Sequence, residues 1–110
     1  MNDRSGEGKR KSMIDIICTQ RIKPGMQVQV EQVLRDAERL TLAHDKGCER
    51  YEWYRGEEPD TYILVERWTD RESVLAHLKS AHMTRILKAL AELVPAKFTV
   101  NRLARLGVAP

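Results

Sequence analysis

Alternating apolar residues mark four short stretches of the chain as β-strands. The stretch 13–22, MIDIICTQRI, is rich in β-branched residues and has apolar side chains on both faces, which is typical of a strand covered on both sides. Two more strands, at 48–56 and 61–68, flank the turn-forming residues EEPD at 57–60, so we expect them to form a hairpin. A closing strand is predicted within 96–106, AKFTVNRLARL.

Apolar residues at helical spacing predict three helices between these strands. The first should end near Gly47, because glycine takes the left-handed conformation that often follows a helix. The second starts from Thr69 or Asp70 as N-cap, and a break near Ser80 separates it from a third helix that stops at Pro95. The order β-α-β-β-α-α-β predicts an α+β, ferredoxin-like fold with an antiparallel sheet and a divided second helix.

Length and charge place one domain between two short tails. The chain has 110 residues and a formal net charge of +3. Residues 1–12 are basic and lack apolar anchors, so we expect a disordered tail, followed by a domain at 13–106 and a C-terminal tail at 107–110. The domain itself is close to neutral and shows no basic stripe interleaved with aromatic residues, which argues against nucleic-acid binding.

Membrane and cofactor signals are missing from the sequence. No stretch approaches the roughly 20 apolar residues of a membrane span, and MIDIIC at 13–18 is too short for a signal-peptide core, so we expect a cytoplasmic protein without membrane contact. Cys18 and Cys48 fit no metal-binding spacing and are expected to be free thiols. The sequence contains no dinucleotide or phosphate-loop motif, so no cofactor or metal is expected.

One face of the predicted sheet should have no helix over it. Successive side chains of a strand point to opposite faces, so the apolar residues of neighbouring strands cannot all point toward the helices. The residues concerned are Tyr51, Trp53, Ile63, Val65, Phe98 and Val100. A bare apolar face usually marks an interface, so we expect a homodimer that packs sheet against sheet.

The order of these elements resembles the antibiotic biosynthesis monooxygenase domain of the dimeric α+β barrel superfamily. The resemblance covers residues 13 to about 106 and rests on these segments: RIKPG at 21–25, KGCERYEWYR at 46–55, LVERWTDRESVLAHLKSAHM at 64–83 and LKAL at 87–90. It implies a dimeric α+β barrel that oxidises a small quinol-like or anthrone-like aromatic substrate. Molecular oxygen would be the co-substrate, without flavin, metal or nicotinamide, and the pocket would be apolar with a proton acceptor.

Two residues are the candidate catalytic groups. His77 is expected to accept the substrate proton, because histidine changes its charge near neutral pH; the alternative is a core histidine held by a hydrogen bond. Glu66 shares a strand face with Trp68 and would need a partner if buried, for example His77; a purely structural ion pair is the alternative.

Four residues are the candidate substrate contacts. Trp68 matches the tryptophan that lines the pocket in the similar oxygenases, although a core position is equally consistent. Tyr62 supplies aromatic surface, and His82 either borders the pocket or caps the third helix. Leu64 stands where some of these oxygenases have asparagine, so a hydrogen-bond donor to the substrate is missing there.

Other functions remain open at this point. Haem is disfavoured, because the third-helix stretch MTRILKAL lacks the axial histidine of the haem-degrading relatives. The spacing of Glu66, His77 and His82 also resembles relatives that isomerise or degrade small phosphorylated signalling sugars, with Arg67 or Lys79 as anion contacts. A dimer that binds a small molecule without catalysis is the third possibility, and an open, polar pocket would count against the oxygenase.

Overall fold

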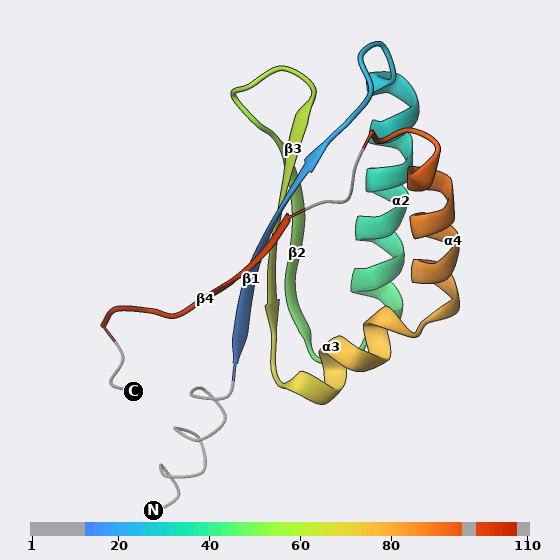
Figure 1. Cartoon of the computed structure of the whole chain (residues 1–110). Coiled ribbons are helices and arrows are strands. Elements are labelled where there is room, and N and C mark those ends of the chain that lie inside the picture. Colours follow the sequence, from blue (N-terminus) through green and yellow to red (C-terminus); the bar gives the residue numbers. More distant parts are fainter. Residues whose placement is uncertain (1–12, 96–98, 108–110) are drawn as a thin grey trace, which may run out of the picture.

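The computed structural model describes residues 13–95 and 99–107, and its elements follow the predicted order (Figure 1). The strands are β1 (Ile14–Arg21), β2 (Cys48–Arg55), β3 (Thr61–Trp68) and β4 (Thr99–Leu103). The helices are α2 (Gln27–His44), α3 (Arg71–Leu78) and α4 (Ala81–Ala91). The predicted N-terminal tail, Phe98 and residues 108–110 lie outside the described residues.

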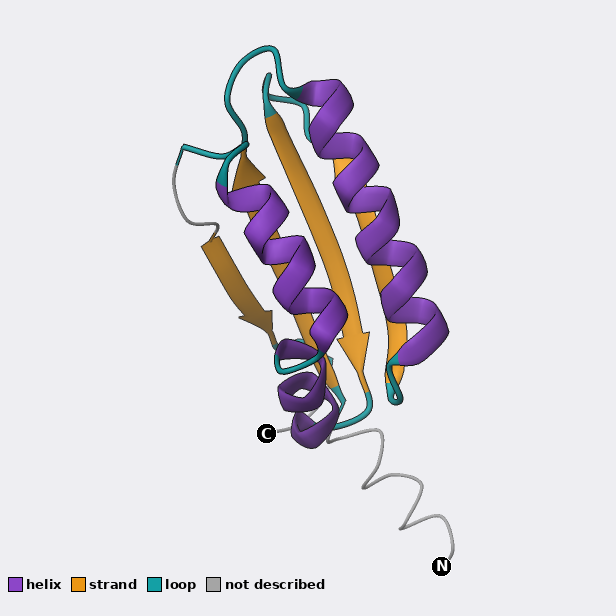
Figure 2. Ribbon diagram, turned by 90° about the vertical axis from the view of Figure 1, so that its right-hand side faces the viewer, coloured by secondary structure: helices purple, strands orange, loops and turns teal. Residues whose placement is uncertain are grey.

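The four strands form one antiparallel sheet in the order β2-β3-β1-β4. The predicted hairpin is present, with Tyr51 of β2 opposite Glu66 of β3. All three helices lie on one side of the sheet, as the two views at right angles show (Figures 1 and 2). The ferredoxin-like α+β fold is therefore confirmed.

Local capping explains where the helices begin and end. Gly47 follows α2 with φ +80°, and a Cβ there would lie 2.2 Å from the Ser73 hydroxyl oxygen, so only glycine fits this turn. The Asp70 carboxylate accepts the Ser73 backbone N–H at 2.8 Å and starts α3. The Ser80 hydroxyl accepts the Met83 backbone N–H at 3.2 Å and starts α4, which accounts for the predicted break between the two helices.

The core lies between the helices and the sheet. Trp68 and Val30 are fully buried at its centre. On the opposite face of the sheet, Ile17 and Val65 face each other across β1 and β3 and are only partly buried. Tyr51 is buried under the helices instead, and Trp53, opposite buried Leu64, faces the same way. Val100, opposite buried Cys18, lies on the helix side of the edge strand, so none of these three residues belongs to the bare face.

Among the residues that the structure describes, no helix combines the length and the hydropathy that a membrane span requires.

Candidate functional site

Asp45, His77 and His82 form a hydrogen-bonded cluster where the three helices meet. Oδ2 of Asp45 lies 2.5 Å from Nδ1 of His77 and 2.9 Å from Nε2 of His82. Asp45 is the C-terminal cap of α2, His77 is in the last turn of α3, and His82 is in the first turn of α4. Both histidines are buried, so this carboxylate fixes the orientation of two enclosed imidazole rings.

The hydrogen bond to Asp45 determines which nitrogen of His77 can act as a base. A carboxylate only accepts hydrogen bonds, so the ring proton of a neutral His77 is assigned to Nδ1. The lone pair is then on Nε2. An imidazole oriented in this way can accept a proton at Nε2, and the neighbouring carboxylate stabilises the resulting cation.

Two aromatic residues enclose His77. The centre of its ring lies 4.7 Å from that of Trp68 and 5.3 Å from that of Tyr51. Tyr51 is 2% exposed, and burial, reinforced by the charge of Glu66, raises the pKa of its hydroxyl well above the usual range. Tyr51 therefore stays neutral, and His77 lies in a largely apolar environment.

Glu66 is buried nearby but does not pair with either histidine. Its carboxylate accepts the indole N–H of Trp68 at 2.8 Å and the thiol of Cys18 at 3.4 Å. The Glu66–His77 pair expected from the sequence is not formed, because Trp68 lies two residues further on the same strand face and reaches the carboxylate itself. Burial and the charge of Glu66 raise the pKa of the free Cys18 thiol to about 12.

The predicted substrate contacts lie in three places. Trp68 and His82 join the Asp45 cluster, whereas Leu64 is a core residue opposite Trp53. Tyr62 lies at the other end of β3, where it lines a separate cleft.

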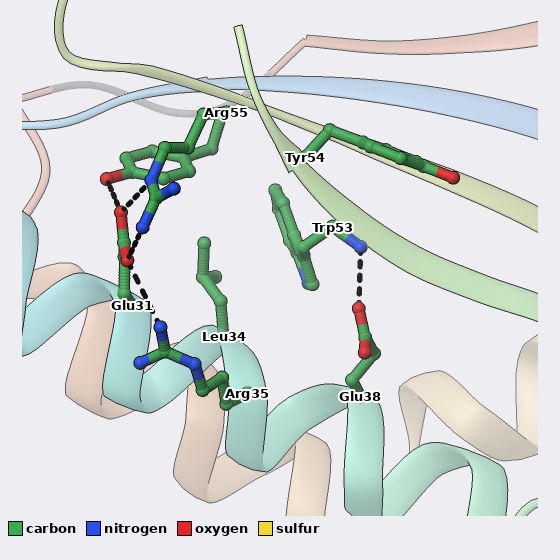
Figure 3. A pocket seen from close by; sticks show the side chains of 8 residues that line it. Glu31, Leu34, Arg35, Glu38, Trp53, Tyr54 and Arg55 are labelled. Atoms are coloured by element: carbon green, nitrogen blue, oxygen red, sulfur yellow. Dashed lines mark hydrogen bonds and ion pairs between the residues drawn. The ribbon is translucent and has the colours of Figure 1, made fainter.

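That cleft, of about 390 Å³, lies between α2 and β2 (Figure 3). The residues that line it are Glu31, Leu34, Arg35, Glu38, Trp53, Tyr54, Arg55 and Tyr62. The carboxylate of Glu31 accepts two bonds of 2.7 Å from Arg55 and one of 2.6 Å from the Tyr62 hydroxyl. These donors lower the pKa of Glu31 to about 2, and Arg55 has the largest effect. The cleft is therefore open, charged at its edge and apolar along Leu34 and Trp53.

Helix α2 and strand β2 both extend from the cleft toward the cluster. Tyr51 is the next helix-facing residue of β2 after Trp53, and its ring contacts His77. On α2, Glu38 of the cleft accepts the Trp53 backbone N–H at 2.7 Å, and Asp45 follows two helical turns later. Neither Tyr51 nor a residue of the cluster lines the cleft, so His77 has no contact with the cleft in this structure.

Sequence reasoning missed Asp45, the residue that joins the cluster. Its only signal was its position directly after the predicted first helix and before Gly47. Arg67, considered as an anion contact, instead donates to Asp15 at 2.6 Å, and its partner residues place it on the opposite face of the sheet. Lys79 is exposed at the end of α3.

Comparisons with known proteins agree with this architecture. A candidate antibiotic biosynthesis monooxygenase from Caulobacter crescentus has a TM-score of 0.82 at 19% identity, over 86% of this chain and 91% of that one. Rv0793 from Mycobacterium tuberculosis has a TM-score of 0.79 at 24% identity, over 90% and 100%. A conserved protein from Methanosarcina mazei has a TM-score of 0.80 at 22% identity, over 88% and 96%.

These structural similarities establish the fold, and a sequence comparison establishes the family. A search of curated proteins finds no match. The family model for antibiotic biosynthesis monooxygenase matches residues 13–89, which is most of the chain. The chain therefore belongs to the antibiotic biosynthesis monooxygenase family.

Proposed function

We propose that this protein is a cofactor-independent monooxygenase for a small, electron-rich aromatic molecule, with His77 as the proton acceptor. Family membership supports oxygenation in general. The observation that carries the proposal is the contact of 2.5 Å between Asp45 and Nδ1 of His77, because it leaves Nε2 as the basic nitrogen between two aromatic walls.

The reaction needs one proton acceptor and molecular oxygen. For an anthrone-like substrate R₂CH₂, Nε2 of His77 takes a proton, and the carbanion that remains passes one electron to O₂. The two radicals combine to R₂CH–OO⁻, and the proton of His77 returns to give R₂CH–OOH. Loss of water yields the ketone, so the sum is R₂CH₂ + O₂ → R₂C=O + H₂O. Asp45 stabilises the transient imidazolium, and Trp68 and Tyr51 keep water away from it.

The other candidate residues orient a side chain or receive the substrate. Glu66 holds the indole of Trp68 by a hydrogen bond of 2.8 Å, so it is a positioning residue. We place substrate entry at the cleft beside Trp53 and Tyr62, which lies about two helical turns along α2 from Asp45. Tyr51 would have to turn aside for a substrate to reach His77, because its ring contacts His77 and it is the helix-facing residue of β2 next to Trp53.

We also propose that two copies pack through the bare sheet face to form a dimeric α+β barrel. The three described helices cover only the other face, and Ile17, Ile63 and Val65 remain partly exposed at the centre of the bare one. An apolar patch of this kind is stabilised when it is covered by a second copy.

The charged cleft favours a second candidate, an isomerase or degradation enzyme for a small phosphorylated signalling sugar. Arg35 and Arg55 project from α2 and β2 at its edge, where both contact the carboxylate of Glu31 (Figure 3). The remaining N–H donors of the two guanidinium groups would suit a phosphate group better than a quinol. In this case His77 would move a proton between carbon atoms without oxygen.

Oxygen uptake distinguishes the two functions. Purified protein is mixed with anthrone in the presence of a chelator, and O₂ consumption and anthraquinone are measured against the uncatalysed rate. We expect one O₂ for each ketone formed. If no uptake occurs and the protein instead exchanges a carbon-bound hydrogen of a ketopentose phosphate with D₂O, the second candidate replaces the first.

A further inference from the structure

We propose that Asp45, His77 and His82 also bind a divalent transition-metal ion such as Zn²⁺, and that the bound ion blocks His77 as a base. Oδ2 of Asp45, Nδ1 of His77 and Nε2 of His82 all lie within 4.8 Å of one another. Three different helix ends supply them, so the arrangement is a product of the fold and not of one local motif. Both histidines are buried, which shields the site from competing water.

The distances require only a small adjustment. Ligand atoms around a tetrahedral zinc ion, each about 2.0–2.1 Å from the metal, lie about 3.3 Å apart. The two histidine nitrogens are now 2.5 Å and 2.9 Å from Oδ2 of Asp45. These two pairs would therefore open by less than about 1 Å. The two histidine nitrogens, which lie within 4.8 Å of each other, would have to approach to about 3.3 Å, which side-chain rotation and a slight shift of the helix ends can provide.

The donor set determines the class of metal. Two imidazole nitrogens and one carboxylate suit Zn²⁺, Co²⁺ or Ni²⁺, whereas Mg²⁺ and Ca²⁺ prefer oxygen ligands. Three protein ligands leave a fourth tetrahedral position for a water molecule. We therefore expect zinc or cobalt to bind and magnesium not to bind.

Metal binding changes the tautomer of His77. In the hydrogen-bonded cluster the proton is assigned to Nδ1 and the lone pair to Nε2. Coordination uses the lone pair of Nδ1, so the ring proton must move to Nε2, which can then accept no further proton. Inhibition by zinc thus rests on the proposed function, whereas metal binding itself does not.

Cobalt and zinc titrations test the site directly. The visible absorption of added Co²⁺ and its displacement by Zn²⁺ are measured for the wild type, His82→Ala, Asp45→Asn and His44→Ala, each checked for folding by circular dichroism. His44 is the matched control, because it is exposed and its ring lies 6.2 Å from that of His82. We expect His82→Ala and Asp45→Asn to weaken binding at least about 10-fold and His44→Ala to leave it unchanged.

The location of the metal site and its effect on activity are tested by different outcomes. Equal zinc affinity in the wild type and a folded His82→Ala, or loss of binding in His44→Ala, would place the metal on the surface and overturn the proposed site. If binding follows the expected pattern, zinc should inhibit anthrone oxidation with the same midpoint, and a chelator should restore it. Zinc that binds at the cluster without slowing an active enzyme would overturn the inhibition.

Discussion

Oδ2 of Asp45 lies 2.5 Å from Nδ1 of His77, a contact that bridges 32 positions of sequence and joins the end of α2 to the last turn of α3. The same oxygen lies 2.9 Å from His82 at the start of α4. One carboxylate therefore fixes three helix ends around the candidate base. The turn that follows Asp45 should matter for stability as well as for the site.

Replacing Gly47 by alanine should destabilise the protein more than replacing Gly25. Both glycines have positive φ, +80° and +84°, so alanine at either position should cost about 1–2 kcal/mol in backbone strain. Only at Gly47 would the new Cβ also meet Ser73, at 2.2 Å from its hydroxyl oxygen, whereas nothing lies within 4 Å at Gly25. Urea unfolding of the two variants measures the difference, and equal losses would show that the turn relaxes away from Ser73.

Glu31 should make stability depend on pH in the acid range. Arg55 and Tyr62 lower the pKa of Glu31 in the folded protein from 4.5 to about 2. The unfolded state then binds a proton more readily, so the stabilisation is complete above pH 4.5, falls as the pH drops toward 2, and is absent below that.

Thermal melts of the wild type and Glu31→Gln at several pH values test this dependence. The wild type should be the more stable at pH 6, and the difference should shrink between pH 4.5 and pH 2. Glu57→Gln, which removes a charge from an exposed turn, is the control. A constant difference between wild type and Glu31→Gln across this range would rule out the ionised Glu31 as its source.

Removing the indole N–H of Trp68 should show how much its hydrogen bond to Glu66 contributes to the stability of the fold. Trp68→Phe leaves the buried carboxylate with only the weak Cys18 thiol donor, so the loss of stability should include about 1–3 kcal/mol for the lost bond of 2.8 Å. In a Glu66→Gln background the same substitution should cost less, because the amide is neutral. A double-mutant cycle measures the coupling, and a coupling of zero would mean that the bond contributes nothing.

A charge on the bare sheet face should break the proposed dimer. Val65 lies at the centre of that face, opposite Ile17, so Val65→Glu would bury an unpaired charge between two copies. Val28→Glu introduces the same charge on α2, where the side chain is 81% exposed, and should have no effect. Light scattering should show dimers for the wild type and Val28→Glu but monomers for Val65→Glu; a wild type that is already monomeric would contradict the proposal.

The order of strands and helices could be predicted because local sequence patterns set where each element begins and ends. The alternation of β3, the cap at Asp70, the break at Ser80 and the left-handed turn at Gly47 each depend on residues within a few positions of one another. Side-chain partners across long separations were beyond that reasoning. Asp45 meets His77 only because α2 and α3 end at the same end of the sheet.

The expected pairing of Glu66 with His77 is absent for a different reason. The nearest donor to Glu66, Trp68, was visible in the sequence as the next residue on the same strand face, yet the sequence reasoning looked for a charged partner. The cleft beside Tyr62 gave no sequence signal, because its volume depends on how far apart α2 and β2 pack.

The most direct measurement of the central claim is the rate of oxygen uptake with anthrone by the wild type, His77→Gln and His44→Gln. Glutamine keeps much of the size of His77 but cannot accept the proton, so we expect the rate to fall by roughly 10² or more. His44→Gln should match the wild type, because this histidine is exposed and belongs to neither the cluster nor the cleft. A folded His77→Gln that oxidises anthrone at the wild-type rate would contradict the assignment of His77 as the base.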